Sequence, residues 1–127
     1  MTDLTKKAQE NTVTAEQNWI SICKLQDLPL DAGVAALLHA DSPEETQIAL
    51  FRTSDDAVYA ISNFDPFSEA NVLARGILCS IGEQLAVASP VLKEHFDLST
   101  GQCFEDEAVS IATFPVKIAE GNVLVAA

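Results

Sequence analysis

Short apolar segments separated by turn-forming residues make up most of this chain. Segments that are briefly apolar, or in which apolar and polar residues alternate, are typical of β-strands. Those that predict strands are residues 19–23, 47–52, 57–61, 77–79, 84–88, 96–98, 109–114, 116–118 and 123–125. Residues 53–56 predict an acidic hairpin turn. Strands at such short intervals, without a long amphipathic helix, predict an all-β sandwich or barrel.

Two segments do not follow this pattern. Residues 34–38, Val-Ala-Ala-Leu-Leu, are apolar throughout, and so short a run fits a buried strand or a short helix. Residues 1–17 are polar and lack apolar periodicity, which predicts a flexible N-terminal arm. The sequence therefore predicts one folded domain over residues 18–127.

The charge balance is strongly acidic. The 127 residues include 19 Asp and Glu against 7 Lys and Arg, for a formal net charge of −12. Nucleic acids and anionic membranes attract cationic surfaces, so neither is an expected partner. The acidity either keeps the domain soluble or steers it toward a basic protein surface. The chain has no apolar run of bilayer length and no secretory signal, which predicts a soluble, cytoplasmic protein.

The reactive side chains form no catalytic set. Cys23, Cys79 and Cys103 lack metal-type spacing and are expected to be small buried residues. His39 and His95 are expected to be structural. Residues 105–107, Glu-Asp-Glu, lack the ligand spacing of a calcium loop and are expected to be solvated charges. No catalytic residue is predicted, and the chain is not expected to be an enzyme on its own.

The stretch from residue 63 to residue 101 resembles the cluster-binding part of a Rieske iron–sulfur domain. Asn63-Phe64-Asp65-Pro66 lies where that family has Cys-x-His, and Ser89-Pro90-Val91-Leu92 lies where it has Cys-Pro-x-His. Phe96-Asp97-Leu98-Ser99-Thr100-Gly101 then matches the family pattern Phe-Asp-x-x-Thr-Gly. The resemblance implies a Rieske-like antiparallel sandwich or barrel with an inserted two-loop subdomain at about residues 62–98.

The cluster ligands of the resembled family are missing. Their four positions fall on Asn63, Asp65, Ser89 and Leu92. A Rieske centre needs two thiolates on one iron and two imidazoles on the other. Asn and Ser are poor substitutes for thiolate, and Leu92 has no donor atom. The resemblance therefore implies a degenerate site that holds no metal.

A narrower resemblance is to the small subunit of bacterial NAD(P)H-dependent nitrite reductase. It rests on residues 63–68, 72–76, 88–98 and 100–103. The resemblance implies a cofactor-free accessory or regulatory subunit in a cytoplasmic complex. In that complex the large subunit carries FAD, an iron–sulfur cluster and sirohaem, and reduces nitrite to ammonium in nitrate assimilation or nitrite detoxification.

Two other functions stay open at this point. One is a Rieske-type [2Fe-2S] electron-transfer protein with unusual ligands. The other is a free-standing β-domain that binds some other protein.

The degenerate loops are the expected docking surface for the large subunit. Apolar side chains there either fill the space of a lost cluster or form an exposed patch that marks an interface. The expected partner-binding residues are Phe64, Pro66, Phe67, Val91, Lys93 and His95. The alternative docking site is the acidic turn at residues 105–107.

Overall fold

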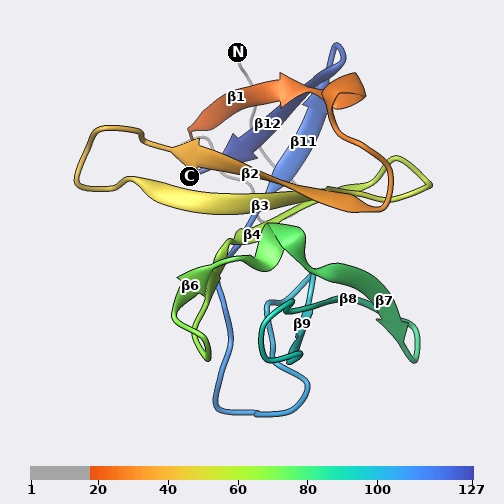
Figure 1. The fold of residues 1–127 in the computed structure, drawn as a ribbon. Coiled ribbons are helices and arrows are strands. Elements are labelled where there is room, and N and C mark those ends of the chain that lie inside the picture. Colours follow the sequence, from red (N-terminus) through yellow and green to blue (C-terminus); the bar gives the residue numbers. More distant parts are fainter. Residues whose placement is uncertain (1–17) are drawn as a thin grey trace.

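The computed structural model describes residues 18–127, which form a larger base and a smaller lobe below it (Figure 1). The predicted arm, residues 1–17, lies outside the described residues. The base contains one sheet in the order β1-β12-β11 and one in the order β10-β4-β3-β2. Its strands are β1 (Trp19–Lys24), β2 (Ala32–Leu38), β3 (Thr46–Arg52), β4 (Val58–Ser62), β10 (Thr113–Phe114), β11 (Val116–Ala119) and β12 (Asn122–Ala126). All pairings between these strands are antiparallel.

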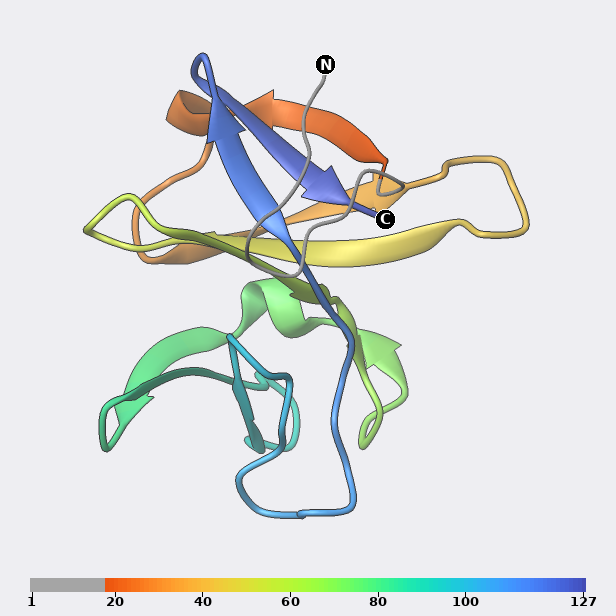
Figure 2. The same ribbon diagram turned by 180° about the vertical axis from the view of Figure 1, so that it is seen from behind.

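The smaller lobe is inserted between β4 and β10. It holds two small antiparallel sheets, β5-β6 and β7-β8-β9. Figure 2 shows the chain returning from the bottom of this lobe to the base through one long connection. The elements of the lobe are β5 (Phe64–Asp65), β6 (Ala70–Asn71), the 3-10 turn η2 (Leu73–Arg75), β7 (Ile77–Ile81), β8 (Gln84–Ala88) and β9 (His95–Asp97). A second 3-10 turn, η1 (Leu25–Asp27), follows β1 in the base.

Strand β3 is buried on both faces. Side chains alternate across a strand, so Ile48 and Leu50 point to one side while Ala49 and Phe51 point to the other. All four are almost completely inaccessible to solvent. This double burial explains the unbroken apolar run Ile-Ala-Leu-Phe, since a strand with one wet face would alternate with polar residues.

The two faces of β3 and β4 belong to two different cores. The upper core lies between the sheets of the base, and its buried members are Leu28, Leu38, Ile48, Leu50, Ala60, Val123 and Val125. The lower core lies between the base and the lobe, and its buried members are Ala49, Phe51, Ile61, Leu73, Val87, Phe96, Leu98 and Cys103. The β3–β4 hairpin is therefore the shared wall that holds the lobe against the base.

The predicted fold class is confirmed, and the structure settles the ambiguous segment. Residues 34–38 belong to strand β2, which pairs with β3 along its whole length. The hairpin predicted around residues 53–56 is also present, as β3 and β4. Within residues 18–127, no helix is long and apolar enough to cross a membrane.

One predicted strand is wrong over most of its length. Residues 109–112 form no ladder, and only Thr113 and Phe114 of the predicted segment pair as a strand. The segment bonds instead to neighbouring loops, where the amide of Ile111 donates to the carbonyl of Gly101 at 2.8 Å. Val109 and Ile111 pack on the lower core. The apolar and polar residues alternate because every second side chain packs on the core, although the segment has no partner strand.

Gly33 in β2 sets how closely the lobe approaches the base. A Cβ atom at this position would lie 2.3 Å from the carbonyl oxygen of Ala74 in η2 and 2.6 Å from the ring of Phe51. No side chain fits in that gap, so the chain must have glycine where η2 crosses β2.

We expect Gly33→Ala to destabilise the domain by about 1–3 kcal/mol, because the added methyl group forces η2 away from β2. Urea unfolding followed by circular dichroism measures the loss. Gly82→Asn is the matched control, since nothing lies within 4 Å of a Cβ there and Asn tolerates its φ of 63°. Equal stabilities for the two variants would contradict the close packing of the lobe.

Candidate functional site

The four positions that correspond to Rieske ligands lie on the two loops of the smaller lobe. Asn63 and Asp65 lie at the start of the β5–β6 hairpin, and Ser89 directly follows β8. All three side chains are buried, whereas Leu92, in the loop between β8 and β9, is 51% exposed. Three of the four positions thus carry buried polar side chains, and the fourth faces solvent.

A hydrogen bond between Asp65 and Ser89 joins the two loops. The Ser89 hydroxyl donates to Asp65 Oδ2 at 2.6 Å, and the Ser68 hydroxyl donates to the same oxygen at 2.9 Å. The amide of Phe67 donates to Asp65 Oδ1 at 2.9 Å. Both carboxylate oxygens therefore have partners, which a buried charge requires. This network links the loops directly, as a shared metal cluster would.

Asn63 ties the same loop to the base. Its Oδ1 accepts a hydrogen bond from the amide of Ala74 at 2.7 Å, and its Nδ2 donates to Gln47 Oε1 at 3.1 Å. Its backbone amide also donates to the carbonyl of Gln47 at 3.0 Å. Asn63 is therefore a structural clamp between β3, η2 and the first loop.

The Asp65 carboxylate is held in its charged form. Burial by itself raises the pKa of Asp65, but hydrogen bonds from Ser89, Phe67 and Ser68 outweigh it, and the pKa lies below its ordinary value of 3.8. The group is therefore ionised at neutral pH. Its negative charge is stabilised by donated hydrogen bonds, and among residues 18–127 no basic side chain forms an ion pair with it.

This set of residues does not fit a [2Fe-2S] cluster. A Rieske centre takes two thiolates and two imidazoles. Here the first three positions offer an amide, a carboxylate and a hydroxyl that are already hydrogen-bonded, and Leu92 offers nothing. Within residues 18–127, no group of three or more His, Cys, Asp or Glu side chains is arranged to hold a metal ion. The lobe keeps the shape of a cluster domain without the ligands of one.

The apolar residues of the loops divide into two groups. Phe64 and Val91 are 42% and 49% exposed. Phe67 instead turns inward, where its ring centroid lies 6.2 Å from that of Phe96 in the lower core. Pro66 is half-buried. Of the two possibilities left open by the sequence, Phe67 fills the core, whereas Phe64, Val91 and Leu92 are exposed on the two loops that the Asp65–Ser89 bond joins. These three residues are here called the tip patch.

His95 and the acidic turn contact each other on the lobe. His95 Nδ1 lies 2.5 Å from Glu105 Oε2, and the backbone amide of His95 donates to Glu105 Oε1 at 2.8 Å. Burial raises the pKa of Glu105, yet its contacts with His95 bring the pKa below its ordinary value. Glu105 is therefore more than the solvated charge that the sequence predicted. Lys93, two residues before His95, is exposed.

Sequence reasoning missed the polar residues that support the site. Ser68 donates to Asp65, Gln47 accepts from Asn63, and Asp97 accepts from the amides of Ser99 and Thr100 at 2.7 and 3.1 Å. Two of these had local signals, since a Ser three residues after an Asp and an Asp before Ser-Thr-Gly are typical of side-chain-capped turns. Gln47 had none, because it is 16 residues from its partner.

We expect Asp65 to make stability depend on pH in the acidic range. Its pKa is lower when folded than when unfolded, so its contribution is complete above about pH 4 and is lost as pH falls through the folded pKa. The difference in free energy of unfolding between the wild type and Asp65→Asn should therefore shrink on acidification. Chemical unfolding of both proteins at pH values from about 2 to about 7, roughly one pH unit apart, measures this difference.

Ser89→Ala should cost about 1–3 kcal/mol at neutral pH, because it leaves a buried carboxylate oxygen short of a donor. Ser99→Ala, at an exposed position, is the control.

A difference in free energy of unfolding between the wild type and Asp65→Asn that stays constant with pH would mean that Asp65 is not preferentially charged in the fold.

Comparison with known proteins agrees with the geometry. The sequence model of the Rieske-like [2Fe-2S] domain matches residues 18–126. The nitrite reductase (NADH) small subunit of Escherichia coli strain K12 is 42% identical over 106 residues, which is 83% of this chain and 94% of that protein. The solution structure of the nitrite reductase [NAD(P)H] small subunit from Erwinia carotovora superimposes with a TM-score of 0.71 at 45% identity, covering 86% of this chain and 81% of that one.

A third relative differs in its organisation. The nitrite reductase [NAD(P)H] large subunit of Klebsiella oxytoca is 39% identical over 118 residues, which is 93% of this chain but only 12% of that protein. The same domain thus occurs as a separate small chain and as one part of a long polypeptide. Its sequence and its fold place this chain in the Rieske-like domain family and, within that family, among the small subunits of nitrite reductase.

Proposed function

We propose that this chain is a cofactor-free small subunit that docks on the large subunit of a cytoplasmic NAD(P)H-dependent nitrite reductase. The large subunit would carry FAD, an iron–sulfur cluster and sirohaem, and would reduce nitrite to ammonium in nitrate assimilation. The observation that carries this proposal is the Asp65–Ser89 hydrogen bond in place of a cluster. The lobe therefore keeps the surface of a Rieske-like domain, while the positions of the cluster ligands are occupied by hydrogen-bonded side chains.

The chain's own chemistry supports an accessory role. Hydride and multi-electron steps need a cofactor, and the described residues offer no set of ligands for a metal cofactor. Burial raises the pKa of Cys103 and of Cys23, which keeps both thiols protonated and unreactive. What remains is binding, namely holding, ordering or shielding some part of the large subunit.

The tip patch supports docking through the loops. Phe64, Val91 and Leu92 expose large apolar side chains on adjacent loops, and such clusters are typical of interfaces. Pro66, Lys93 and His95 lie beside them and supply a mixed rim. Phe67, on the same loop as Phe64, is anchored in the lower core by its contact with Phe96.

The relative from Klebsiella oxytoca supports the choice of partner. In that protein the domain is part of the large-subunit polypeptide. Two parts of one chain stay at high effective concentration, so even weak docking is maintained. A separate small subunit lacks that advantage and must bind through its own surface. The net charge of −12 would help, because it steers the chain toward a basic surface.

We expect the tip patch to carry much of the affinity for the large subunit. The double variant Phe64→Asp, Leu92→Asp should bind the purified large subunit at least about tenfold more weakly, since two apolar contacts are lost and two charges would be buried. Biolayer interferometry measures the affinity, with circular dichroism to check folding. Leu37→Asp is the matched control, because Leu37 is 48% exposed on β2 of the base.

Equal losses from Leu37→Asp and from the double variant would move the docking face away from the tip patch. The acidic turn at residues 105–107 is then the next surface to test. No measurable binding of the wild type to the large subunit would remove the proposal as a whole. The free-standing β-domain would then be the better hypothesis.

The alternative of a [2Fe-2S] electron-transfer protein has its own test. We expect the purified chain to be colourless, because Leu92 cannot bind iron and the other three positions are hydrogen-bonded within the protein. Ultraviolet–visible absorption and chemical determination of iron and sulfide measure this. Visible charge-transfer bands with stoichiometric iron and sulfide would favour the electron-transfer function instead.

A further inference from the structure

Among residues 18–127, strand β7 forms an edge of the lobe that no other strand covers. In the sheet β7-β8-β9 it pairs only with β8, through five consecutive residue pairs from Ile77 to Ile81 without a bulge. Natural sheets usually shield such an edge with Lys, Pro or a bulge. The sequence Ile-Leu-Cys-Ser-Ile has none of these, and Ile77 is the most exposed large apolar residue of residues 18–127, at 72%.

The register shows which backbone groups point outward. The amide of Leu98 donates to the carbonyl of Leu85 at 3.0 Å, so Leu85 directs its peptide groups toward β9. Leu85 lies opposite Ser80 in the β7–β8 ladder, and because its peptide groups face β9, the two residues form a non-hydrogen-bonded pair. In such a pair of an antiparallel ladder, the N–H and C=O groups of both residues point away from the partner strand. Ser80, and by the same alternation Leu78, therefore present their N–H and C=O groups on the free edge of β7.

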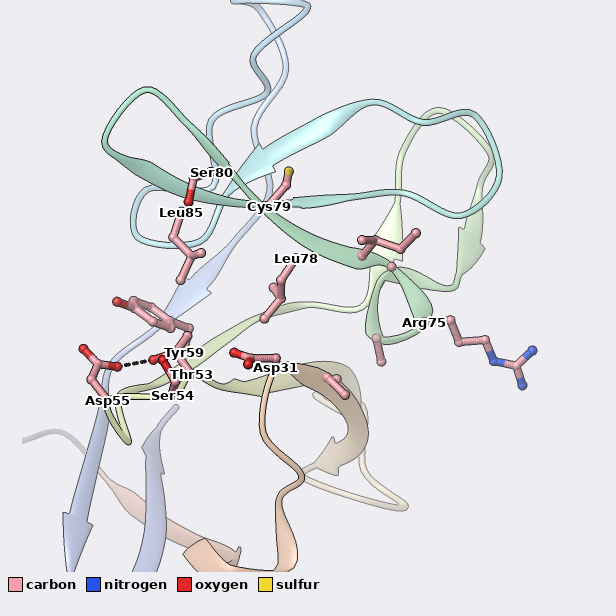
Figure 3. A pocket seen from close by; sticks show the side chains of 15 residues that line it. Asp31, Thr53, Ser54, Asp55, Tyr59, Arg75, Leu78, Cys79, Ser80 and Leu85 are labelled. Atoms are coloured by element: carbon pink, nitrogen blue, oxygen red, sulfur yellow. Dashed lines mark hydrogen bonds between the residues drawn. The ribbon is translucent and has the colours of Figure 1, made fainter.

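A groove of about 940 Å³ runs beside this edge, between β7 and the base. Figure 3 shows Leu78 and Leu85 directed into it from the hairpin, with Tyr59 and Asp31 across from them. Leu78, Leu85 and Tyr59 also pack against the lower core, so the apolar floor of the groove is rigidly supported. The groove has room for the side chains of an added strand.

The rim of the groove is mainly acidic. Asp31 and Asp55 line it and are exposed. The hydroxyl of Thr53 donates to Asp55 (Figure 3), and this bond lowers the pKa of Asp55 below its ordinary value, so the carboxylate is charged. Arg75 extends away at the opposite end. Two carboxylates against one outlying guanidinium favour a cationic occupant.

We propose that the free edge of β7 binds an extended segment of the large subunit, which adds to the β7-β8-β9 sheet as a fourth strand and places a Lys or Arg side chain against Asp31 and Asp55. Backbone hydrogen bonds to Leu78 and Ser80 would supply affinity, and the groove would select apolar side chains on the incoming strand. This inference rests on the proposed function, because the large subunit is the partner. A second copy of this chain is a poor occupant, since it would bring the same acidic rim and a net charge of −12.

Amide hydrogen exchange of the wild type tests the strand addition directly. The isotope-labelled chain is exchanged in deuterated buffer, alone and in complex with the purified large subunit, and the recovered chain is read by NMR. The amides of Leu78 and Ser80 should exchange at least about tenfold more slowly in the complex, because they gain acceptors. The amide of Ser54, in the turn across the groove, reports on general shielding of the region. Unchanged exchange at Leu78 and Ser80 in a complex that forms overturns the inference while leaving the proposed function intact.

A variant pair gives an independent reading. Ser80→Pro removes the outward N–H, and an edge strand tolerates Pro where that group faces solvent. It should bind the large subunit about 30-fold more weakly than Ser80→Ala, which keeps the backbone donor. Should Ser80→Pro unfold, the exchange experiment on the wild type still decides. Equal binding by the two folded variants overturns the strand addition.

The rim is tested by charge removal alone. Asn tolerates the positive φ of Asp31, 58°, so the double variant Asp31→Asn, Asp55→Asn keeps the fold and loses two charges. It should weaken binding about fivefold at low salt and less at high salt. Sedimentation measurements test the alternative occupant, a second copy of this chain. A dimer that the Ser80→Pro substitution dissociates would assign the edge to self-association and overturn the inference. Failure of the wild type to bind the large subunit at all overturns both this inference and the proposed function.

Discussion

Burial of the β3–β4 hairpin on both faces is the constraint on which the rest of the structure depends. Ile48 and Leu50 complete the core of the base, and Ala49 and Phe51 complete the core of the lobe. Neither core closes without this shared wall. Asn63 directly follows β4, so the first loop of the lobe begins at a point that is already fixed by the hairpin. The position of the site is thus set by packing some distance from its chemistry.

The lobe shows how a cluster-binding shape persists after the ligands are lost. A metal cluster joins two loops by strong bonds from both. Here a carboxylate on one loop and a hydroxyl on the other do the same through a 2.6 Å hydrogen bond, reinforced by donors within the first loop. Asp97, in β9, stabilises the next turn in the same way. It accepts hydrogen bonds from the amides of Ser99 and Thr100 and one from the Gln84 side chain at 2.7 Å. Polar networks that are fully paired can hold loops rigidly.

The described residues of the site form no set of metal ligands, so the proposed role of the chain rests on the surface of the lobe. The tip patch and the β7 edge lie on the same lobe but present different chemistry, the first apolar side chains and the second unpaired backbone beside an acidic groove. In the proposed docking the base contributes support. A rigid scaffold with binding loops at one end is a common arrangement because loops vary without disturbing the core.

The sequence by itself determined the all-β class, most strand positions and the loss of the cluster ligands, because alternation, turn residues and ligand identity are local properties. It also placed Gly101 in a Thr-Gly turn, but only the structure shows why glycine is needed there, since φ is 82° and a Cβ would lie 2.0 Å from the carbonyl oxygen of Ile111. Only the tertiary structure decided whether residues 34–38 are strand or helix, since β3 supplies their partner. It also separated Phe67 in the core from Phe64 on the surface, and paired Asp65 with Ser89 across 24 residues. Burial and long-range hydrogen bonds depend on what folds against a segment, which its own residues do not encode.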